Sequence, residues 1–317
     1  LWLLVAAITT LGQGGGPGVA QLPATPVKAT MPTFKTVSGP GAMFPALQVL
    51  PPDGELARFK YVTKEYFVSG IAQGQPYTTR VVVRRPVDPK KFSGIVVAEP
   101  MHPTGNDWMF YFLHTYLMTQ GHVAVEIVTG SLPLFTTANA ARYKDLEIGN
   151  TQANEILAQV GLLLKNDQPD GILEGLPMRT MILTGTSASA AAPVAYLPAH
   201  MVYRGEEMQP IFVGFLPTGI GAHSTIMKGD VPVVQMPTMT EGVRTAASGN
   251  KYRRPDGDAP GDQFRIYEVA GMAHIDSRIN PVYKPNLCTH PMSEFRVVMA
   301  LVAGLDRLVQ WSDKGKV

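Results

Sequence analysis

Short apolar runs alternate with helical patterns through most of the chain. Ile95-Val96-Val97-Ala98 and residues 123–128 are almost continuously apolar, as in strands buried on both faces of a parallel sheet. Between them, residues 107–119 place apolar side chains three and four positions apart, which predicts a helix ending before Gly121. A second helix is predicted over residues 150–164, where the apolar side chains again fall on one side.

The remaining elements follow the same alternation. Residues 59–71 and 78–85 read as two strands joined by the turn Gln73-Gly74-Gln75-Pro76. Further strands are predicted at residues 180–185, 211–216, 231–236 and 264–269, and a last helix at about 293–311. We therefore expect one α/β domain, with a mostly parallel central sheet, an antiparallel start and helices on both faces.

The first 55 residues have a different character. Residues 1–20 begin apolar and then become rich in small residues, which predicts the rest of a secretory signal without its charged start. We expect cleavage after Ala20 and a secreted or periplasmic protein; the alternative is a disordered or interfacial N-terminus. Residues 21–55 are rich in Pro and Gly without a period, which indicates an extended arm, and residues 56–317 form the α/β domain.

Composition excludes several classes of function. The net charge is only +2, so nothing points to nucleic acid, and the apolar N-terminal run is too short for stable membrane insertion. The single cysteine, Cys288, excludes an intrachain disulfide and a cysteine-based zinc cluster. The seven histidines show no metal-ligand spacing. We expect neither a metal nor a cofactor.

The strongest chemical signal is Gly185-Thr186-Ser187-Ala188-Ser189-Ala190, directly after an apolar strand and before a segment rich in small residues. A serine on a tight strand-to-helix turn needs small residues two positions to either side. Such a turn exposes the hydroxyl of Ser187 as a nucleophile and directs the next backbone N–H, that of Ala188, toward a developing oxyanion. The alternative is an ordinary strand-to-helix turn.

A serine nucleophile needs a base and an orienting acid at later strand ends. Glu241 follows the strand at residues 231–236, and His274 lies in the loop after the strand at residues 264–269. We assign Glu241 as the acid and His274 as the base; otherwise Glu241 is an exposed loop acid and His274 a surface or core histidine. Asp276 is the next candidate for the acid.

The loop after the strand at residues 95–98 is the expected source of a second oxyanion donor. The backbone N–H groups of Met101 and His102 are the candidates, and His102 either contacts substrate or caps the loop. Too few residues separate the strands at 211–216 and 231–236 for a large cap domain. The irregular segments 129–147 and 242–262 would then build the pocket walls, with Phe135, Tyr143 and Tyr252 as substrate contacts.

Together these motifs resemble a bacterial family of α/β-hydrolase-domain proteins that includes many exported serine esterases. The similarity runs from about Tyr66 to the end of the chain and includes the elbow at 185–189, the strand leading to Glu241, and residues 267–274. The resemblance implies the α/β-hydrolase fold, with Ser187 as nucleophile, Glu241 as acid and His274 as base. Family members often have Asp at the acid position and Gln at the position of Ala188.

The expected function is that of a secreted serine hydrolase that cleaves small-molecule or polymeric carboxylic esters through an acyl-enzyme. An amidase or acyltransferase would use the same triad. A non-catalytic binding protein on this scaffold is the alternative from a different class. The sequence gives neither the acyl and alcohol groups nor the oligomeric state.

Overall fold

A computed structural model of the protein describes residues 22–46, 55–220, 226–247, 249, 253–276 and 293–315. Tyr252 and Cys288 lie outside these residues.

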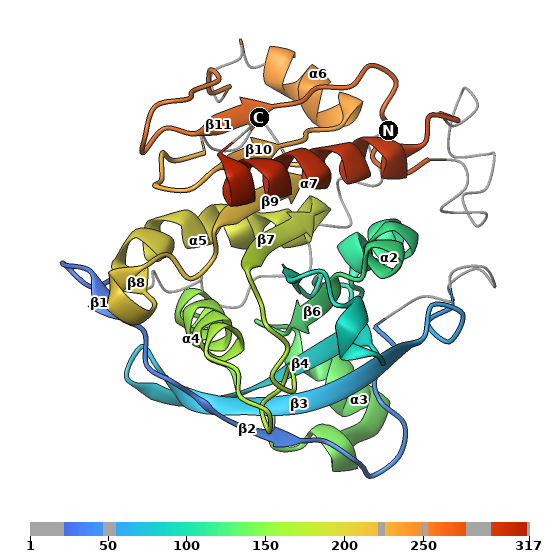
Figure 1. Ribbon diagram of the computed structural model, residues 1–317, viewed down its shortest axis with the longest axis vertical. Coiled ribbons are helices and arrows are strands. Elements are labelled where there is room, and N and C mark those ends of the chain that lie inside the picture. Colours follow the sequence, from blue (N-terminus) through green and yellow to red (C-terminus); the bar gives the residue numbers. More distant parts are fainter. Residues whose placement is uncertain are drawn as a thin grey trace.

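A nine-stranded sheet dominates the described part of the chain (Figure 1). Its order is β11-β10-β9-β7-β5-β6-β4-β3-β2, and β1 pairs separately with β8. The strands are β1 (Val27–Lys28), β2 (Thr33–Thr36), β3 (Tyr61–Ala72), β4 (Gln75–Pro86), β5 (Ile95–Pro100), β6 (Val123–Ile127), β7 (Thr180–Thr186), β8 (Tyr203–Arg204), β9 (Gly214–Thr218), β10 (Val233–Gln235) and β11 (Phe264–Ile266). The pairs from β6 to β11 are parallel, whereas β2, β3, β4 and β6 pair antiparallel.

Helices cover both faces of this sheet. The α-helices are α2 (Trp108–Gln120), α3 (Leu132–Tyr143), α4 (Ala153–Lys165), α5 (Ala191–Val202), α6 (Met239–Ala247) and α7 (Val297–Lys314). Short 3₁₀ helices are η2 (Pro89–Lys91), η3 (Ser187–Ala190) and η4 (Glu206–Met208). The α/β class, the parallel sheet and its antiparallel start are confirmed.

Local chemistry explains the boundaries that the sequence predicted. Gln73 and Gly74 both have positive φ, 52° and 71°, as a two-residue hairpin turn between β3 and β4 requires. Helix α2 ends at Gly121, whose φ of 73° gives the left-handed C-cap that glycine adopts without strain.

The segment 129–147, predicted as irregular, contains α3, and α6 runs into the second predicted irregular segment. Residues 217–220 and 226–230, the described part of the stretch where a cap would enter, contain no helix.

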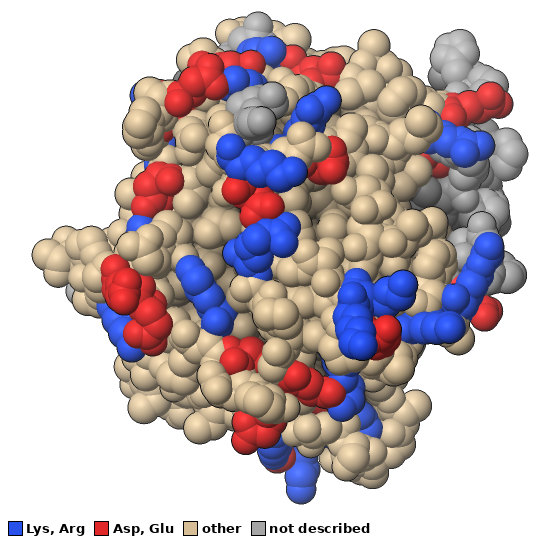
Figure 2. Space-filling model, viewed as in Figure 1, with Lys and Arg blue, Asp and Glu red and all other residues tan. Residues whose placement is uncertain are grey.

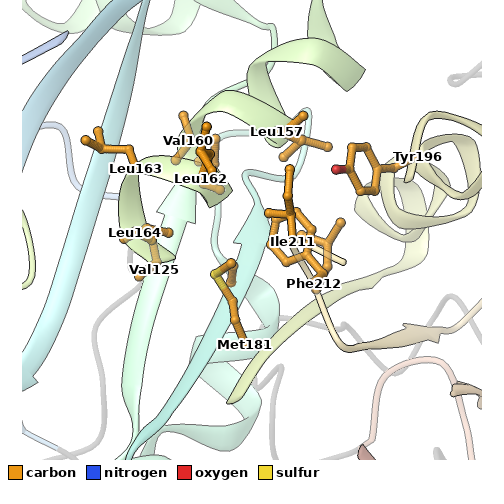
Figure 3. Packing of buried hydrophobic residues seen from close by; sticks show 14 of the residues in the cluster. Val125, Leu157, Val160, Leu162, Leu163, Leu164, Met181, Tyr196, Ile211 and Phe212 are labelled. Carbon is orange, nitrogen blue, oxygen red and sulfur yellow. The ribbon is translucent and has the colours of Figure 1, made fainter. Parts of the chain in front are cut away.

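Strand side chains alternate between two apolar layers. Val96, Ala98 and Leu183 face α4 and α5, and Figure 3 shows this layer, where Leu157 and Tyr196 approach Phe212. The intervening strand residues belong to a second cluster with α2 and α7, namely Ile95, Val97, Ile182 and Val234. Burial on both faces explains why the central strands are apolar throughout.

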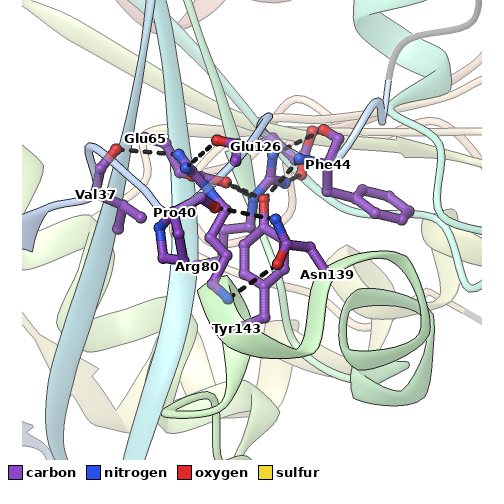
Figure 4. Close-up of polar contacts among 10 residues, drawn as sticks. Val37, Pro40, Phe44, Glu65, Arg80, Glu126, Asn139 and Tyr143 are labelled. Atoms are coloured by element: carbon purple, nitrogen blue, oxygen red, sulfur yellow. Dashed lines mark hydrogen bonds and ion pairs between the residues drawn. The ribbon is translucent and has the colours of Figure 1, made fainter.

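A buried ionic network joins the antiparallel part of the sheet to α3 and the arm (Figure 4). Arg80 forms ion pairs with Glu65 and Glu126, and all three side chains are at most 2% exposed. Glu65 also accepts from Arg142 Nε at 2.8 Å and from the hydroxyl of Tyr143 at 2.8 Å.

The N-terminal arm is fixed through the same network. Arg142 donates to the backbone oxygens of Val37 at 3.1 Å and Gly41 at 2.9 Å, and the N–H of Phe44 donates to the hydroxyl of Tyr143 at 2.6 Å. The described arm residues, 22–46, therefore pack against the domain through specific contacts, and residues 33–36 add strand β2 to the sheet.

On the face drawn in Figure 2, Lys and Arg side chains are interspersed with Asp and Glu. This mixture agrees with the small net charge of the chain. Among the described helices, none is long and apolar enough to cross a membrane.

We expect Arg80→Met to destabilise the fold by about 3–5 kcal/mol, because Glu65 and Glu126 would stay buried with one guanidinium fewer to compensate them. The control is Lys35→Met, which breaks the exposed pair of Lys35 with Asp145 and should change the unfolding free energy by less than about 1 kcal/mol. Urea denaturation measures both. Equal, small effects in the two variants would contradict the structural role of the network.

Candidate active site

The predicted catalytic residues follow strands whose carboxyl ends meet at one edge of the sheet. β5, β7, β9, β10 and β11 run parallel, so the loops after them emerge together. Ligand sites in open α/β sheets lie at this edge. The predicted triad residues Ser187, Glu241 and His274 follow β7, β10 and β11, so all three lie at this edge of the sheet.

Ser187 lies on a strained turn directly after β7. Its φ is +56°, a conformation that costs a non-glycine residue free energy and is typical of functional sites. A Cβ atom at Gly185 would lie 2.6 Å from the backbone oxygen of Ser189, so only glycine fits two positions before the serine. The small-residue requirement predicted from the sequence thus has a direct steric cause.

Ser189 replaces the second glycine of the usual elbow pattern and closes the turn with its hydroxyl. Its Oγ accepts from the N–H of Thr186 at 3.1 Å and donates to the oxygen of the same residue at 2.9 Å. The side chain of Thr186 in turn accepts from the N–H of Ser189, which completes a capping box around Ser187. Ser187 itself is half-buried and Ala188 is exposed at the start of η3.

Glu241 and His274 face each other across two loops. Nδ1 of His274 lies 3.2 Å from Oε1 of Glu241. The other carboxylate oxygen accepts from the N–H of Thr238 at 2.9 Å and from its hydroxyl. Thr238 precedes α6 and Glu241 is its third residue, so one carboxylate caps the helix and contacts the imidazole.

The environment favours the ionised form of Glu241. Burial opposes ionisation, but the contact with His274 and the hydrogen bonds from Thr238 outweigh it and lower the pKa below the usual range for glutamate. A carboxylate in contact with Nδ1 fixes the proton on that nitrogen. Nε2 of His274 then remains to accept a proton from a nucleophile.

Gly219, just after β9, places this pair beside the serine turn. A Cβ atom on Gly219 would lie 3.1 Å from Cε1 of His274 and 3.2 Å from Oγ1 of Thr186, the residue before Ser187. The imidazole and the elbow therefore flank the same glycine. A backbone hydrogen bond from Met239 to Met272, 2.8 Å long, ties the loop of the acid to the loop of the histidine.

The loop after β5 is anchored by a buried carboxyl group. Both oxygens of Glu99 accept from the first turn of α2, from Met109 at 2.9 Å and Phe110 at 2.8 Å. Burial, opposed by these two hydrogen bonds, raises the pKa of Glu99 to about 8. β5 and β7 are parallel neighbours paired from Ile95 with Thr180 to Ala98 with Leu183, so the loop with His102 and the turn with Ser187 follow at the same edge of the sheet.

The structure corrects the backbone donors expected in this loop. The N–H of Met101 donates to the oxygen of Ile127 at 2.9 Å, and the N–H of His102 donates to the oxygen of Asn106 at 2.8 Å. The first bond continues the sheet beyond β5 and the second closes the loop, so neither N–H is left for an oxyanion in this conformation. Ala188, at the start of a helix whose first N–H groups lack partners within the helix, retains its predicted role.

Two predicted pocket contacts are core residues instead. Phe135 and Tyr143 are both 0% exposed and belong to one cluster with Phe67 and Met101. The hydroxyl of Tyr143 already joins Glu65 to Phe44. Their assignment as substrate contacts is wrong, because α3, which carries both residues, packs into the core against the buried network. Tyr252, the third predicted contact, lies outside the described residues.

Asp276, the alternative acid, has a different position. Its side chain is 1% exposed and its Oδ2 accepts from the N–H of Val297 at 3.1 Å, at the start of α7. Glu241 is the acid that contacts His274.

Sequence reasoning missed two positioning residues. Thr238 carried a readable signal, because Thr-x-x-Glu before a helix is a capping-box pattern. Gly219 follows a strand like any loop glycine, and only the packing of His274 against it shows its importance.

The chain belongs to the alpha/beta hydrolase domain family, whose pattern it matches over residues 21–317. Comparison with curated protein sequences gives no match.

Several solved structures are similar in fold. A thermostable esterase from Pseudomonas putida is 15% identical, with 79% of this chain and 82% of that chain covered and a TM-score of 0.46. A fungal esterase from Rhizomucor miehei is 11% identical, with coverage of 78% and 84% and a TM-score of 0.46. Brefeldin A esterase, a bacterial homologue of human hormone-sensitive lipase, is 12% identical, with coverage of 85% and 80% and a TM-score of 0.47. Likenesses this distant carry no argument about activity.

We expect Gly219→Ala to lower turnover on the order of 10²-fold, because the new methyl group would displace His274 and the residue has a φ of +56°. The matched control is Gly229→Ala, where a Cβ atom would meet nothing within 4 Å. Steady-state kinetics on an aryl ester, with circular dichroism for the fold, measure both. Equal turnover in the two variants would contradict the placement of His274 against Gly219.

Proposed function

We propose that the protein is a serine hydrolase that cleaves carboxylic esters, with Ser187 as nucleophile, His274 as general base and Glu241 as orienting acid. One observation carries the proposal. The Glu241–His274 pair, with a distance of 3.2 Å, flanks the same glycine as the strained turn that holds Ser187. If the Glu241–His274 pair served only stability, nothing would require the neighbouring serine to adopt a backbone conformation with positive φ.

In the first half of the reaction, Oγ of Ser187 attacks the acyl carbon and its proton passes to Nε2 of His274. The carbonyl electron pair moves onto oxygen, where the N–H of Ala188 stabilises the negative charge. Glu241 stabilises the imidazolium that forms. The carbonyl then re-forms, the bond to the alkoxy oxygen breaks, and His274 returns its proton to the leaving alkoxide.

Water completes the cycle. His274 removes a proton from water as the oxygen attacks the acyl-enzyme. The second tetrahedral intermediate then collapses, the bond to Oγ of Ser187 breaks, and His274 returns the proton to that oxygen as the acid is released. Every proton in this scheme moves between His274, Ser187, water and the leaving group. The reaction is hydrolysis when water accepts the acyl group and acyl transfer when an alcohol or amine accepts it.

Export is part of the proposal and rests on the sequence of residues 1–20. Expression of the natural gene followed by fractionation would test it. Recovery of the mature chain from the periplasm or medium, with its N-terminus near Gln21, supports export. Recovery of the unprocessed chain from the cytoplasm contradicts it.

We expect Ser187→Ala and His274→Ala each to lower ester turnover by about 10⁴–10⁶-fold, and the double variant to lose little more, because nucleophile and base act as one unit. Glu241→Gln should cost less, since the amide retains the side chain's size but not the charge that stabilises the imidazolium.

Turnover is measured on graded aryl and alkyl esters and on matching amides, and a fluorophosphonate probe should label wild type but not Ser187→Ala. The control is Ser69→Ala, which removes a hydroxyl bonded to Thr78 in the hairpin. Near wild-type turnover in folded Ser187→Ala would overturn the proposed function. Faster cleavage of amides than of esters would overturn the substrate class.

A further inference from the structure

The oxyanion of the proposed reaction has one identified donor, the N–H of Ala188, while the backbone of the neighbouring loop is engaged elsewhere. The N–H of Gly105 donates to the oxygen of His102 at 2.8 Å, in addition to the bonds made by Met101 and His102. The N–H of Thr104 donates to the ring of His102. The N–H groups of Met101, His102, Thr104 and Gly105 are thus all engaged, so the side chains of this loop become candidates for a second donor.

The His102 ring has the right tautomer for that task. Nδ1 accepts from the N–H of Thr104 at 3.2 Å, and Oγ1 of Thr104 lies 2.7 Å from the same nitrogen. A neutral imidazole that accepts at one nitrogen carries its proton on the other. Nε2–H is thus the donor that the ring can present to a substrate.

The ring also has the right charge. Burial and the nearby His274 together lower the pKa of His102 to about 4, so it is neutral at pH 7. A neutral ring donates a hydrogen bond without repelling the imidazolium that forms on His274 when Ser187 attacks. A permanently cationic side chain at this position would oppose that step by repelling the imidazolium.

The position of His102 fits the same role. β5 and β7 are parallel neighbours, so the loop that carries His102 and the turn that carries Ser187 emerge at the same edge of the sheet. The ring is also close enough to His274 to be affected by its charge. His102 thus lies on the β5 side of the nucleophile, where a second oxyanion donor belongs in this kind of site.

We propose that Nε2–H of His102 is the second donor of the oxyanion hole, opposite the N–H of Ala188. The inference rests on the proposed function, since it assigns a group to the transition state of that reaction. Thr104 positions the ring by holding Nδ1 as an acceptor. The donor is therefore a side chain that mutation can remove, unlike a backbone N–H.

The test compares His102→Ala, His102→Gln and the control His114→Ala, a histidine on α2 whose ring contacts Tyr111. We expect His102→Ala to lower kcat about 10²–10³-fold, the usual loss for one oxyanion donor, with KM changed only a few-fold. His102→Gln keeps an N–H donor and should recover at least tenfold of that loss. His114→Ala should retain wild-type turnover.

Phenylboronic acid supplies a readout that a merely structural role would not move. It forms a tetrahedral adduct on the serine, so its inhibition constant should rise in His102→Ala in proportion to the loss of kcat/KM. The ratio of kcat/KM between wild type and His102→Gln should stay constant from pH 5.5 to 9. A ratio that titrates in this range would show acid–base work by His102 and overturn the donor role.

Failure of this inference is distinct from failure of the proposed function. If Ser187→Ala is inactive but His102→Ala keeps kcat and boronate affinity within threefold of wild type, His102 is not the donor. If Ser187→Ala is active, the serine mechanism itself is wrong. Should His102→Ala fail to fold, His102→Gln decides, because turnover below 1% of wild type in a folded glutamine variant would overturn the assignment.

Discussion

The ion pairing of Arg80 with Glu65 and Glu126 is the constraint on which the rest of the structure depends. A guanidinium that is 0% exposed must be compensated locally, because its transfer out of water costs several kcal/mol. Glu65 supplies part of that compensation from β3 and Glu126 supplies the rest from β6, on either side of β4. Register among these three strands is therefore fixed by charge as well as by apolar packing.

The same network extends to the edge of the sheet at which the proposed active site lies. Arg84 pairs with Asp107, at the start of α2, at 2.5 Å and lies 3.6 Å from Glu126. The buried group contains the guanidiniums of Arg80, Arg84 and Arg142 and the carboxyls of Glu65, Glu99, Asp107 and Glu126. Burial raises the pKa of Glu99 and of Asp107, and the positive charge of Arg84 opposes both shifts. The loop between Glu99 and Asp107 carries His102, and both of its ends are fixed by this cluster.

Much of this protein could be predicted from its sequence because the determining interactions are local. The serine turn depends on small residues within two positions, and the α/β class follows from the alternation of buried apolar runs with helical patterns. Glu241 and His274 were predicted because strand ends in a parallel sheet share an edge. Their contact and the tightness of the turn are confirmed by the geometry.

What the sequence could not give are pairings between distant residues. Phe135 and Tyr143 looked like pocket residues because nothing near them in sequence shows that Glu65 and Phe44 would bury them. The N–H groups of Met101 and His102 looked available because their acceptors, Ile127 and Asn106, are set by strand pairing and loop closure. In each case a contact that forms only in the folded state engages a group that looked available in the sequence.

Glu241 makes the proposed site dependent on a short helix. One oxygen closes the first turn of α6 through Thr238, and the other holds the imidazole of His274. A nine-residue helix is only marginally stable without such contacts. When its first turn opens, the carboxylate is free to rotate and the imidazole loses its fixed orientation at the same moment. Local opening costs far less than global unfolding, so opening of α6 would separate His274 from its carboxylate while the central sheet is still intact.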